Sequence, residues 1–164
     1  MKNLYLIGGP MGVGKTTVCQ RLKKELPAAV FLDGDWCWDA DPFVVTDETK
    51  AMVQRNIAFM LNSFLGCSAY ENVIFCWVMH QQAIIDTLLS ALDTDGRRVH
   101  VISLTASEKQ LSRRISADIA RGKRDEGSLR RSLGYLPLYR RLDSVKIDTT
   151  GLTRRQTAEK IARL

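Results

Sequence analysis

The chain has no apolar stretch long enough to span a bilayer, which argues against an integral membrane protein. Its first residues carry one lysine before a short apolar run that leads directly into a glycine-rich sequence, which is typical of a strand and not of a cleaved signal peptide. The four cysteines form no Cys-x-x-Cys pair and have no metal-type spacing with the two histidines. We therefore expect a cytoplasmic protein with reduced thiols and no membrane association.

The length and the apolar content of the chain favour one folded domain. With 164 residues, 45% of them hydrophobic, the chain is long enough to bury a sizeable core and falls within the usual size of a single domain. It contains no internal repeat, low-complexity tract or linker-like stretch. We therefore expect residues 1–164 to form a single domain, as a monomer or a homodimer.

The positive charge of the chain is concentrated in one segment. Residues 113–141 contain nine basic and three acidic side chains, and the rest of the chain contains 15 of each, so this segment alone accounts for the net charge of +6. One basic segment favours a clamp on a polyphosphate over general nucleic-acid binding. Two alternatives remain open: a solvated helix face, and an RNA-binding surface whose affinity would depend on salt.

The apolar run near the N-terminus ends in a phosphate-loop pattern. Gly9-x4-Gly14-Lys15-Thr16 follows a strand-like run and precedes a helix-forming sequence. Glycines permit backbone angles that let successive N–H groups surround an anion, while the lysine reaches the outer phosphates and the threonine hydroxyl can hold Mg²⁺. We expect the whole loop to bind nucleotide phosphates: Gly9, Pro10, Met11, Gly12, Val13, Gly14, Lys15, Thr16 and Thr17. A plain glycine-rich turn is the alternative.

Strand-like and helix-like segments alternate along the chain. Apolar runs predict strands at residues 29–32, 72–79, 99–104 and 145–147, after the first strand that leads into the loop. Amphipathic patterns predict a first helix that ends near Pro27 and further helices at residues 46–66, 83–92, 107–122, 129–142 (with a break or kink at Pro137) and 153–164. Because the run at 72–79 is apolar without alternation, we place it centrally in a parallel sheet. The pattern predicts an α/β fold with helices on both faces of the sheet.

Polar residues follow every predicted strand. The phosphate loop follows the first strand, Asp33 and Asp35 the second, His80 the third, Thr105 and Ser107 the fourth, and Asp148 and Thr149 the fifth. Ligands of parallel sheets bind beyond the carboxyl ends of the strands, where these residues meet. The sequence therefore predicts a site at that edge.

The two aspartates after the second strand are candidates for phosphoryl-transfer chemistry, which needs charge neutralisation and a group that orients the accepting oxygen. Side chains alternate along an extended backbone, so Asp33 and Asp35 point opposite ways unless Gly34 bends the chain. We assign Asp35 to the substrate hydroxyl as a base and Asp33 to Mg²⁺, directly or through water, and leave open which residue has which role. A surface turn is the alternative interpretation of Asp-Gly-Asp.

The loop Gly9-Pro-Met-Gly-Val-Gly-Lys-Thr-Thr17 and the second-strand Leu32-Asp-Gly-Asp35 resemble the small P-loop kinases, a group that includes gluconate kinase, shikimate kinase, adenylyl-sulfate kinase and chloramphenicol phosphotransferase. In layout the resemblance covers nearly the whole chain. It implies a P-loop NTPase fold with strand order 2-3-1-4-5, and ATP and Mg²⁺ as cofactors. It also implies an arginine-rich lid at about residues 119–128, with Arg114 and Arg121 on ATP and Arg124 acting in catalysis, and it places Asp148 and Thr149 near the adenine.

The same resemblance implies that the acceptor of the phosphoryl group lies against the segment that begins at Trp36. Trp36, Trp38 and Arg55 are therefore candidate substrate contacts, although the tryptophans could instead pack in the core and Arg55 could be solvated. His80 could hydrogen-bond the substrate or a water, or be a structural histidine.

Two departures from the family pattern limit the resemblance. Trp36-Cys-Trp38 stands where gluconate kinases are expected to have a leucine and a histidine, which puts gluconate specificity in doubt. Trp77-Val-Met-His80 ends the third strand without the acidic residue that many P-loop proteins have there, so Asp33 has more of the metal environment to supply.

These features predict an ATP-dependent kinase that transfers the terminal phosphoryl group to a hydroxyl of a small molecule, such as a metabolite, a nucleotide or an antibiotic. The absence of an Asn-Lys-x-Asp motif for guanine argues against a GTPase. The alternative from a different class is an ATP-binding regulatory module without phosphoryl transfer. Asp-Gly-Asp distinguishes the two, because nucleotide binding alone needs only the phosphate loop and Thr16.

Overall fold

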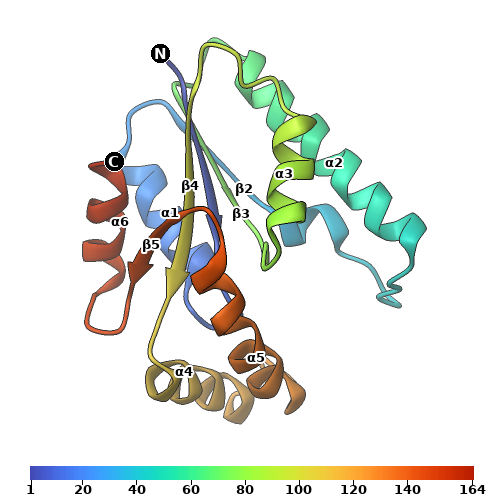
Figure 1. Cartoon of the computed structure of the whole chain (residues 1–164), viewed down its shortest axis with the longest axis vertical. Coiled ribbons are helices and arrows are strands. Elements are labelled where there is room, and N and C mark those ends of the chain that lie inside the picture. The colour runs from blue at the N-terminus through green and yellow to red at the C-terminus, as the bar shows by residue number, and fades with distance from the viewer.

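Five parallel strands form the centre of the protein. The computed structural model describes all 164 residues, and the strands lie side by side in the order β2-β3-β1-β4-β5 (Figure 1). Their bounds are β1 Asn3–Gly8, β2 Ala29–Asp33, β3 Asn72–Cys76, β4 Arg98–Thr105 and β5 Val145–Asp148. The predicted α/β class, the parallel sheet and the 2-3-1-4-5 order are therefore confirmed.

Helices connect the strands. Their bounds are α1 Lys15–Glu25, α2 Asp47–Gly66, α3 Gln82–Ser90, α4 Glu108–Ala120, α5 Gly127–Arg141 and α6 Arg154–Ala162, and a short 3-10 helix, η1, spans Gly34–Trp38. Thr46 and Thr153 begin α2 and α6 with reciprocal capping boxes, which explains why these two helices start where the sequence predicts. None of the helices combines the length and the apolar character that crossing a membrane requires.

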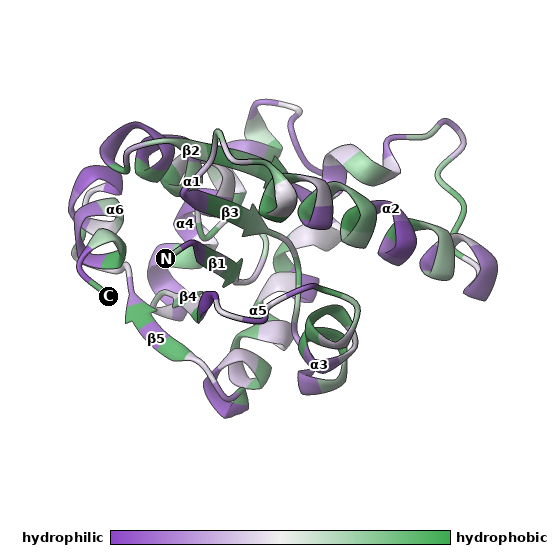
Figure 2. Ribbon diagram, turned by 90° about the horizontal axis from the view of Figure 1, so that it is seen from above, coloured by the Kyte–Doolittle hydropathy of each residue, from purple (hydrophilic) through white to green (hydrophobic).

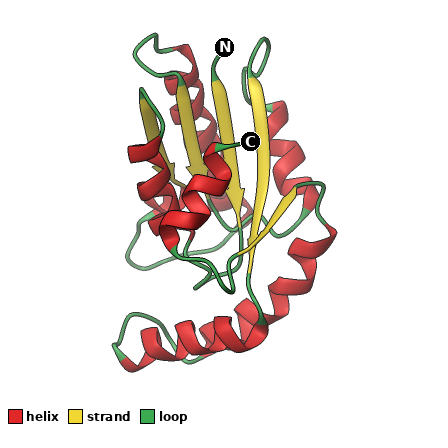
Figure 3. Ribbon diagram, turned by 90° about the vertical axis from the view of Figure 1, so that its left-hand side faces the viewer, coloured by secondary structure: helices red, strands yellow, loops and turns green.

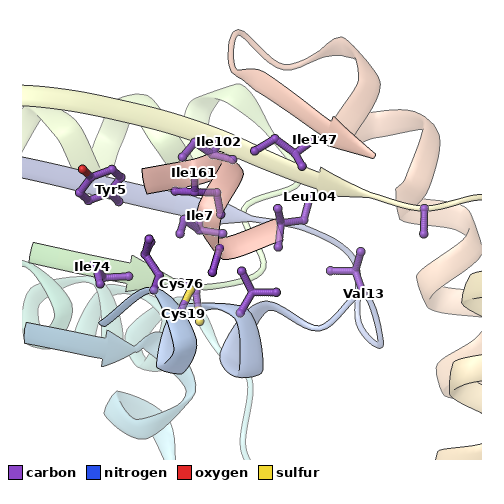
Figure 4. Close-up of a cluster of buried hydrophobic side chains, with 14 of the residues drawn as sticks. Tyr5, Ile7, Val13, Cys19, Ile74, Cys76, Ile102, Leu104, Ile147 and Ile161 are labelled. Carbon is purple, nitrogen blue, oxygen red and sulfur yellow. The ribbon is translucent and has the colours of Figure 1, made fainter. Parts of the chain in front are cut away.

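The sheet is covered on both faces, because alternate residues of each strand pack into one of two apolar clusters. In β1, Tyr5 and Ile7 join the cluster beneath α1 and α6, which Figure 4 shows, whereas Leu4 and Leu6 pack against α2 and α3. Both sets are buried, so the strand has no polar face. Seen from above, the strands are hydrophobic and the surrounding helices carry the hydrophilic residues (Figure 2).

Two features differ from the sequence prediction. β3 ends at Cys76 and not at Met79, because β2 ends at Asp33, which pairs with Cys76, and β1 pairs with β3 only as far as Ile7. Of the break or kink predicted at Pro137, the break is wrong: α5 is one continuous helix from Gly127 to Arg141. Burial of Leu136 and Tyr139, on either side of the proline, holds this part of α5 against the rest of the molecule.

The carboxyl ends of the strands face α4 and α5. Figure 3 shows these two helices beyond the ends of the strands, joined by a turn at residues 121–126. The loops after β1 and β2 end in the same region. The fold therefore brings the predicted site residues of several strands to one edge of the sheet.

Candidate active site

The loop between β1 and α1 has the backbone of an anion cradle. Gly12 and Gly14 have φ values of 78° and 103°, which favour glycine, and Gly14 is the residue before the first turn of α1. A Cβ on Gly9 would lie 2.8 Å from the carbonyl oxygen of Leu104, so the loop passes too close to β4 for any side chain there. A Cβ on Gly14 would meet nothing within 4 Å, which leaves space for an anion at the N-terminus of α1.

Lys15 is held inside this loop. Its Nζ donates to the carbonyl oxygens of Gly9 at 2.8 Å and Pro10 at 3.1 Å. Burial lowers the pKa of this ammonium group, and the charges of Asp33 and Asp35 oppose that shift. Lys15 therefore carries a poorly solvated positive charge at the place where a phosphate would neutralise it.

Two distant residues fix the outside of the loop. The hydroxyl of Ser132, in α5, donates to the carbonyl oxygen of Met11 at 2.6 Å. Arg114, in α4, donates to the carbonyl oxygen of Val13 at 3.1 Å and to Thr149 Oγ1 at 3.2 Å. Hydrogen bonds from α4 and α5 thus hold the loop in position.

Thr16 and Asp33 form the central polar contact of the site. The Thr16 hydroxyl donates to Asp33 Oδ2 at 2.6 Å, and the backbone N–H of Asp35 donates to Asp33 Oδ1 at 3.1 Å. Asp33 is only 4% exposed, so both of its oxygens are fixed in position. A hydroxyl and a carboxylate in contact are the hard oxygen ligands that Mg²⁺ takes in phosphoryl-transfer sites, where phosphates and waters complete the shell.

Asp35 lies in the same cavity as Asp33, although strand alternation alone would separate them. After Asp33 the chain leaves the strand and forms η1, which turns both carboxylates to one side. Gly34 is required at this bend because a Cβ there would lie 2.5 Å from Cγ of Trp77. Burial raises the pKa of the Asp35 carboxyl, the charge of Asp33 raises it further, and Lys15 and a hydrogen bond from Trp77 act in the opposite direction.

A cavity of about 620 Å³ joins these groups. Among its lining residues are most of the predicted phosphate and catalytic residues: Met11, Gly12, Val13, Gly14, Lys15, Thr16, Thr17, Asp33, Asp35, Arg114, Arg121, Arg124 and Thr149. Its volume is in the usual range for small-molecule sites. Gly9 and Pro10 shape the loop through their carbonyl oxygens and do not line the cavity.

The basic segment supplies one wall of the cavity. Four of its nine basic side chains line it: Arg114, Arg121, Lys123 and Arg124. Arg124 pairs with Asp118 of α4 at 3.1 Å. Its charge also lowers the pKa of Asp35, so Arg124 is close enough to act on that carboxylate. Arg131 instead pairs with Asp125 outside the cavity. The wall therefore suits a polyphosphate.

Five predicted contacts lie outside this cavity. Asp148 accepts from both the backbone N–H and the hydroxyl of Thr150, which closes a turn after β5. His80 stacks on Tyr135 with ring centroids 4.2 Å apart, and burial lowers the pKa of its imidazole. This position fits the structural alternative for His80.

The other three belong to η1 and to α2, the helix after it. Trp36 meets the edge of Phe31 at 5.2 Å and remains largely exposed, whereas Trp38 packs on Phe43 at 4.8 Å. Arg55 lines a separate groove between α2 and α3. The structure therefore brings Arg55 to a different surface from Asp35.

Sequence reasoning missed several residues that line the cavity. Arg154 and Thr157 come from the first turn of α6, Lys123 from the turn after α4, and Val78 from the chain after β3. Lys123 stands inside the predicted lid segment, which was the available signal. Nothing in the sequence distinguishes Arg154 from the adjacent Arg155, which pairs with Glu159.

Comparison with known proteins gives a family match and a shared fold. The family model described as an AAA domain matches residues 6–133. A comparison with curated protein sequences finds no match.

Similar solved structures cover almost the whole chain. The tunicamycin resistance protein of Deinococcus radiodurans has a TM-score of 0.76 and 24% identity, over 99% of this chain and 95% of its own. A gluconokinase from Sinorhizobium meliloti 1021 has a TM-score of 0.68 and 19% identity, over 98% and 92%. Shikimate kinase from Acinetobacter baumannii, solved with shikimate, has a TM-score of 0.64 and 25% identity, over 99% and 92%. The chain thus has the fold of the small P-loop kinases.

Proposed function

The chain belongs to the AAA domain family, and from this premise we propose that it is an ATP-dependent kinase that transfers the terminal phosphoryl group to a hydroxyl of a small molecule. The residues on the phosphate side support the donor part of this proposal. Lys15, the N–H groups of the glycine loop, Arg114 and Arg121 surround one cavity and together provide the charge that a triphosphate needs.

The observation that carries the proposal is the pair of carboxylates in this cavity. The hydroxyl of Thr16 lies 2.6 Å from Asp33, which assigns Asp33 to the metal side, and Asp35 lies in the same cavity near the charges of Lys15 and Arg124. A module that only binds nucleotide needs Lys15 and Thr16 but has no use for a second carboxylate whose proton affinity is raised. Asp35 therefore favours phosphoryl transfer over binding alone.

The proposed transfer balances as follows. The acceptor oxygen forms a bond to the terminal phosphorus while the bond from that phosphorus to the bridging oxygen breaks, so that ADP leaves. The hydroxyl proton moves to the carboxylate of Asp35. Lys15 and Arg124 neutralise charge on the phosphoryl oxygens, as the positions of both residues in the cavity allow.

Thr16 and Asp33 would hold Mg²⁺, Thr16 through its hydroxyl and Asp33 directly or through a water. The ion supplies charge neutralisation and alignment of phosphate oxygens when bound. Phosphate oxygens and waters would complete the shell of the ion.

The segment around residues 119–128 is proposed to close over the nucleotide. It begins at the end of α4, contains the turn with Arg121, Lys123 and Arg124, and ends at the first residues of α5. Because α4 also holds the loop through Arg114, movement of the turn would leave the phosphate cradle in place.

Release of ADP tests the proposal. Purified protein with ATP and Mg²⁺ is screened against sugars, shikimate-like acids, nucleosides, aminoglycosides, phenicols and tunicamycin, and we expect ADP release to rise with at least one acceptor. Asp35→Asn should lower the stimulated rate by about 10²–10⁴-fold. Asp95→Asn, in the exposed turn at the opposite end of the sheet, is the matched control and should leave the rate unchanged. Full activity of Asp35→Asn would remove this residue as the base.

A further inference from the structure

Asp118 is the one carboxylate on the basic wall of the cavity. It lies in the last turn of α4 and lines the cavity among the arginines and the lysine of the basic segment. The other two carboxylates of the cavity, Asp33 and Asp35, belong to β2 and η1 and have the roles proposed above. A negative charge among cations that bind phosphate weakens their attraction for it, so the position of Asp118 has to be explained separately.

Asp118 fixes the turn after α4 through its backbone. Its carbonyl oxygen accepts from the N–H of Lys123 at 2.9 Å. One residue further on, the carbonyl oxygen of Ile119 accepts from the N–H of Gly122, also at 2.9 Å. Gly122 has a φ of 68°, so the two bonds form the Schellman motif that commonly ends an α-helix. Arg124 is the first residue after this motif.

The side chain of Asp118 holds Arg124 itself. Arg124 Nε donates to Asp118 Oδ2 at 3.1 Å, and neither terminal nitrogen of the guanidinium has a hydrogen-bond partner in the protein. A guanidinium is planar and rigid, so a bond at Nε restricts the direction of its two terminal amino groups. Those two groups are the pair that binds phosphate oxygens in a bidentate manner.

Arg124 differs in this respect from the other cavity cations that the protein holds by hydrogen bonds. Arg114 uses its terminal nitrogens on the backbone of the glycine loop and on Thr149. Lys15 is bound to two carbonyl oxygens of the same loop. The charge of Arg124 lowers the pKa of both Lys15 and Asp35, so its free end is close to the groups between which the phosphoryl group would pass.

We propose that Asp118 is the positioning residue for Arg124: it holds the guanidinium so that the two terminal amino groups meet the oxygens of the terminal phosphate of ATP and stay on them during transfer. This inference rests on the proposed kinase function. Asp118 itself touches no substrate. The long arginine side chain is thereby ordered before the nucleotide binds, so less conformational entropy is lost on the way to the transition state.

Removal of the carboxylate tests the proposal, because two roles of Asp118 predict opposite results. If Asp118 only opposed phosphate binding by its charge, Asp118→Ala would bind nucleotide more tightly and react as fast as the original protein or faster. If Asp118 positions Arg124, Asp118→Ala should lower kcat about tenfold or more, since small displacements of a positioned group have effects of that size.

The conservative variant separates orientation from charge. Asp118→Asn keeps an oxygen that can accept from Arg124 Nε, and it should retain most of kcat. A loss in Asp118→Asn as large as in Asp118→Ala would contradict the proposal. Both side chains of the pair are partly exposed, and such pairs contribute little to stability, so the variants should keep the fold. Thermal unfolding without nucleotide checks this.

A double-mutant cycle shows whether Asp118 acts through Arg124. Arg124→Ala should lower kcat by about 10²–10³-fold, and Asp118→Ala in that background should cause no further decrease. An equal decrease in both backgrounds would overturn the proposal, because Asp118 would then act independently of Arg124. Asp93→Ala is the matched control. It removes the carboxylate from the Asp93–Arg97 pair of 2.8 Å, at the opposite end of the sheet, and should leave kcat unchanged.

Calorimetry with Mg²⁺ and either ATP or ADP separates this proposal from the kinase function. Amino groups directed at the terminal phosphate favour ATP over ADP, so the ratio of the Kd for ADP to the Kd for ATP should fall about tenfold in Asp118→Ala and in Arg124→Ala and persist in Asp118→Asn. An unchanged or increased ratio in Asp118→Ala would overturn the positioning role and leave an active kinase in place. A decreased ratio in a protein whose ADP release no acceptor raises would overturn the kinase function and leave the orientation of Arg124 supported.

Discussion

At the scale of single residues, the site consists of groups placed where they are individually unfavourable. Desolvation in the cavity lowers the pKa of Lys15, and desolvation together with the charge of Asp33 raises the pKa of Asp35. Each charge is costly in the absence of a ligand, and a bound triphosphate and metal would compensate them. Charged groups whose pKa is shifted by desolvation and by neighbouring charges are typical of functional sites.

The raised pKa of Asp35 predicts a shift in the pH dependence of the reaction. A general base works only when deprotonated, so kcat/KM should fall as the pH decreases through the raised pKa of this carboxyl, above the usual value of about 3.9 for aspartate. Measurement of kcat/KM from pH 4 to 9 checks this, and Asp35→Asn should lose the acidic limb together with most of the rate. An unshifted limb that persists in Asp35→Asn would assign the titration to another group.

The raised pKa of Asp35 also lowers the stability of the folded protein at neutral pH. A carboxyl with a raised folded pKa destabilises the fold above that pKa, and the penalty disappears below the pKa of the unfolded chain. Asp35→Asn should therefore have a higher Tm than the original protein at pH 7, with the difference shrinking near pH 3.5. Asp95→Asn, at an exposed position, is the control for the substitution itself.

At the scale of elements, the sequence predicted most of the fold because local patterns agree with the tertiary structure. The glycine loop needs a strand before it and a helix after it, and both are present as β1 and α1. Strand alternation is absent in β3 because both of its faces are buried, as the apolar run indicated. The end of β3 was missed because it depends on where β1 and β2 stop pairing, which the residues after Cys76 do not encode.

Site residues could be predicted where a sequence motif determines their position. They could not be predicted where the packing of helices determines it. Thr16 and Asp33 follow from the two motifs, and the structure brings them into contact. The direction of Arg55 depends on how α2 packs against α3, and the presence of Arg154 depends on where α6 begins relative to the cavity. Neither arrangement can be derived from periodicity.

The bend between Asp33 and Asp35 gives a prediction for η1 as an element. Gly34→Ala places a Cβ 2.5 Å from Cγ of Trp77, so η1 or the indole must move. We expect a loss of stability of about 1–3 kcal/mol, typical of overpacking, and a large decrease of kcat because Asp35 moves with η1. Unfolding in urea and acceptor-stimulated ADP release measure the two effects.

Gly66→Ala is the matched control for this substitution. Gly66 is the last residue of α2, and a Cβ there meets nothing within 4 Å, so the variant should be as stable as the original protein or slightly more stable. A Gly34→Ala protein with unchanged stability and rate would show that η1 tolerates displacement and that Trp77 does not determine the position of Asp35.

At the scale of the whole molecule, positive and negative charge are concentrated in different parts of the chain. The glycine loop, α4, the turn after it and α6 carry the cations, whereas the part of the chain from residue 26 to residue 96 is acidic. The net charge of +6 therefore describes one wall and not the whole surface. This division argues against general binding of nucleic acid, which needs a continuous basic face.

The division of charge also predicts how ligands and stability are coupled. Mg²⁺ and ATP at about 100 times the Kd should stabilise the protein by about 2.7 kcal/mol, which corresponds to an increase in Tm of about 5–10 °C for a chain of this size. Lys15→Met should abolish most of this increase because the loop loses its central cation.

Without nucleotide the Lys15→Met variant should have a Tm at or above that of the original protein, since it replaces a desolvated charge by an apolar side chain of similar length. Lys24→Met, at an exposed position of the same helix, should keep the full increase. Thermal unfolding of the three proteins with and without Mg²⁺ and ATP measures these increases in Tm. An equal increase in Lys15→Met and in the original protein would mean that the nucleotide binds away from the glycine loop.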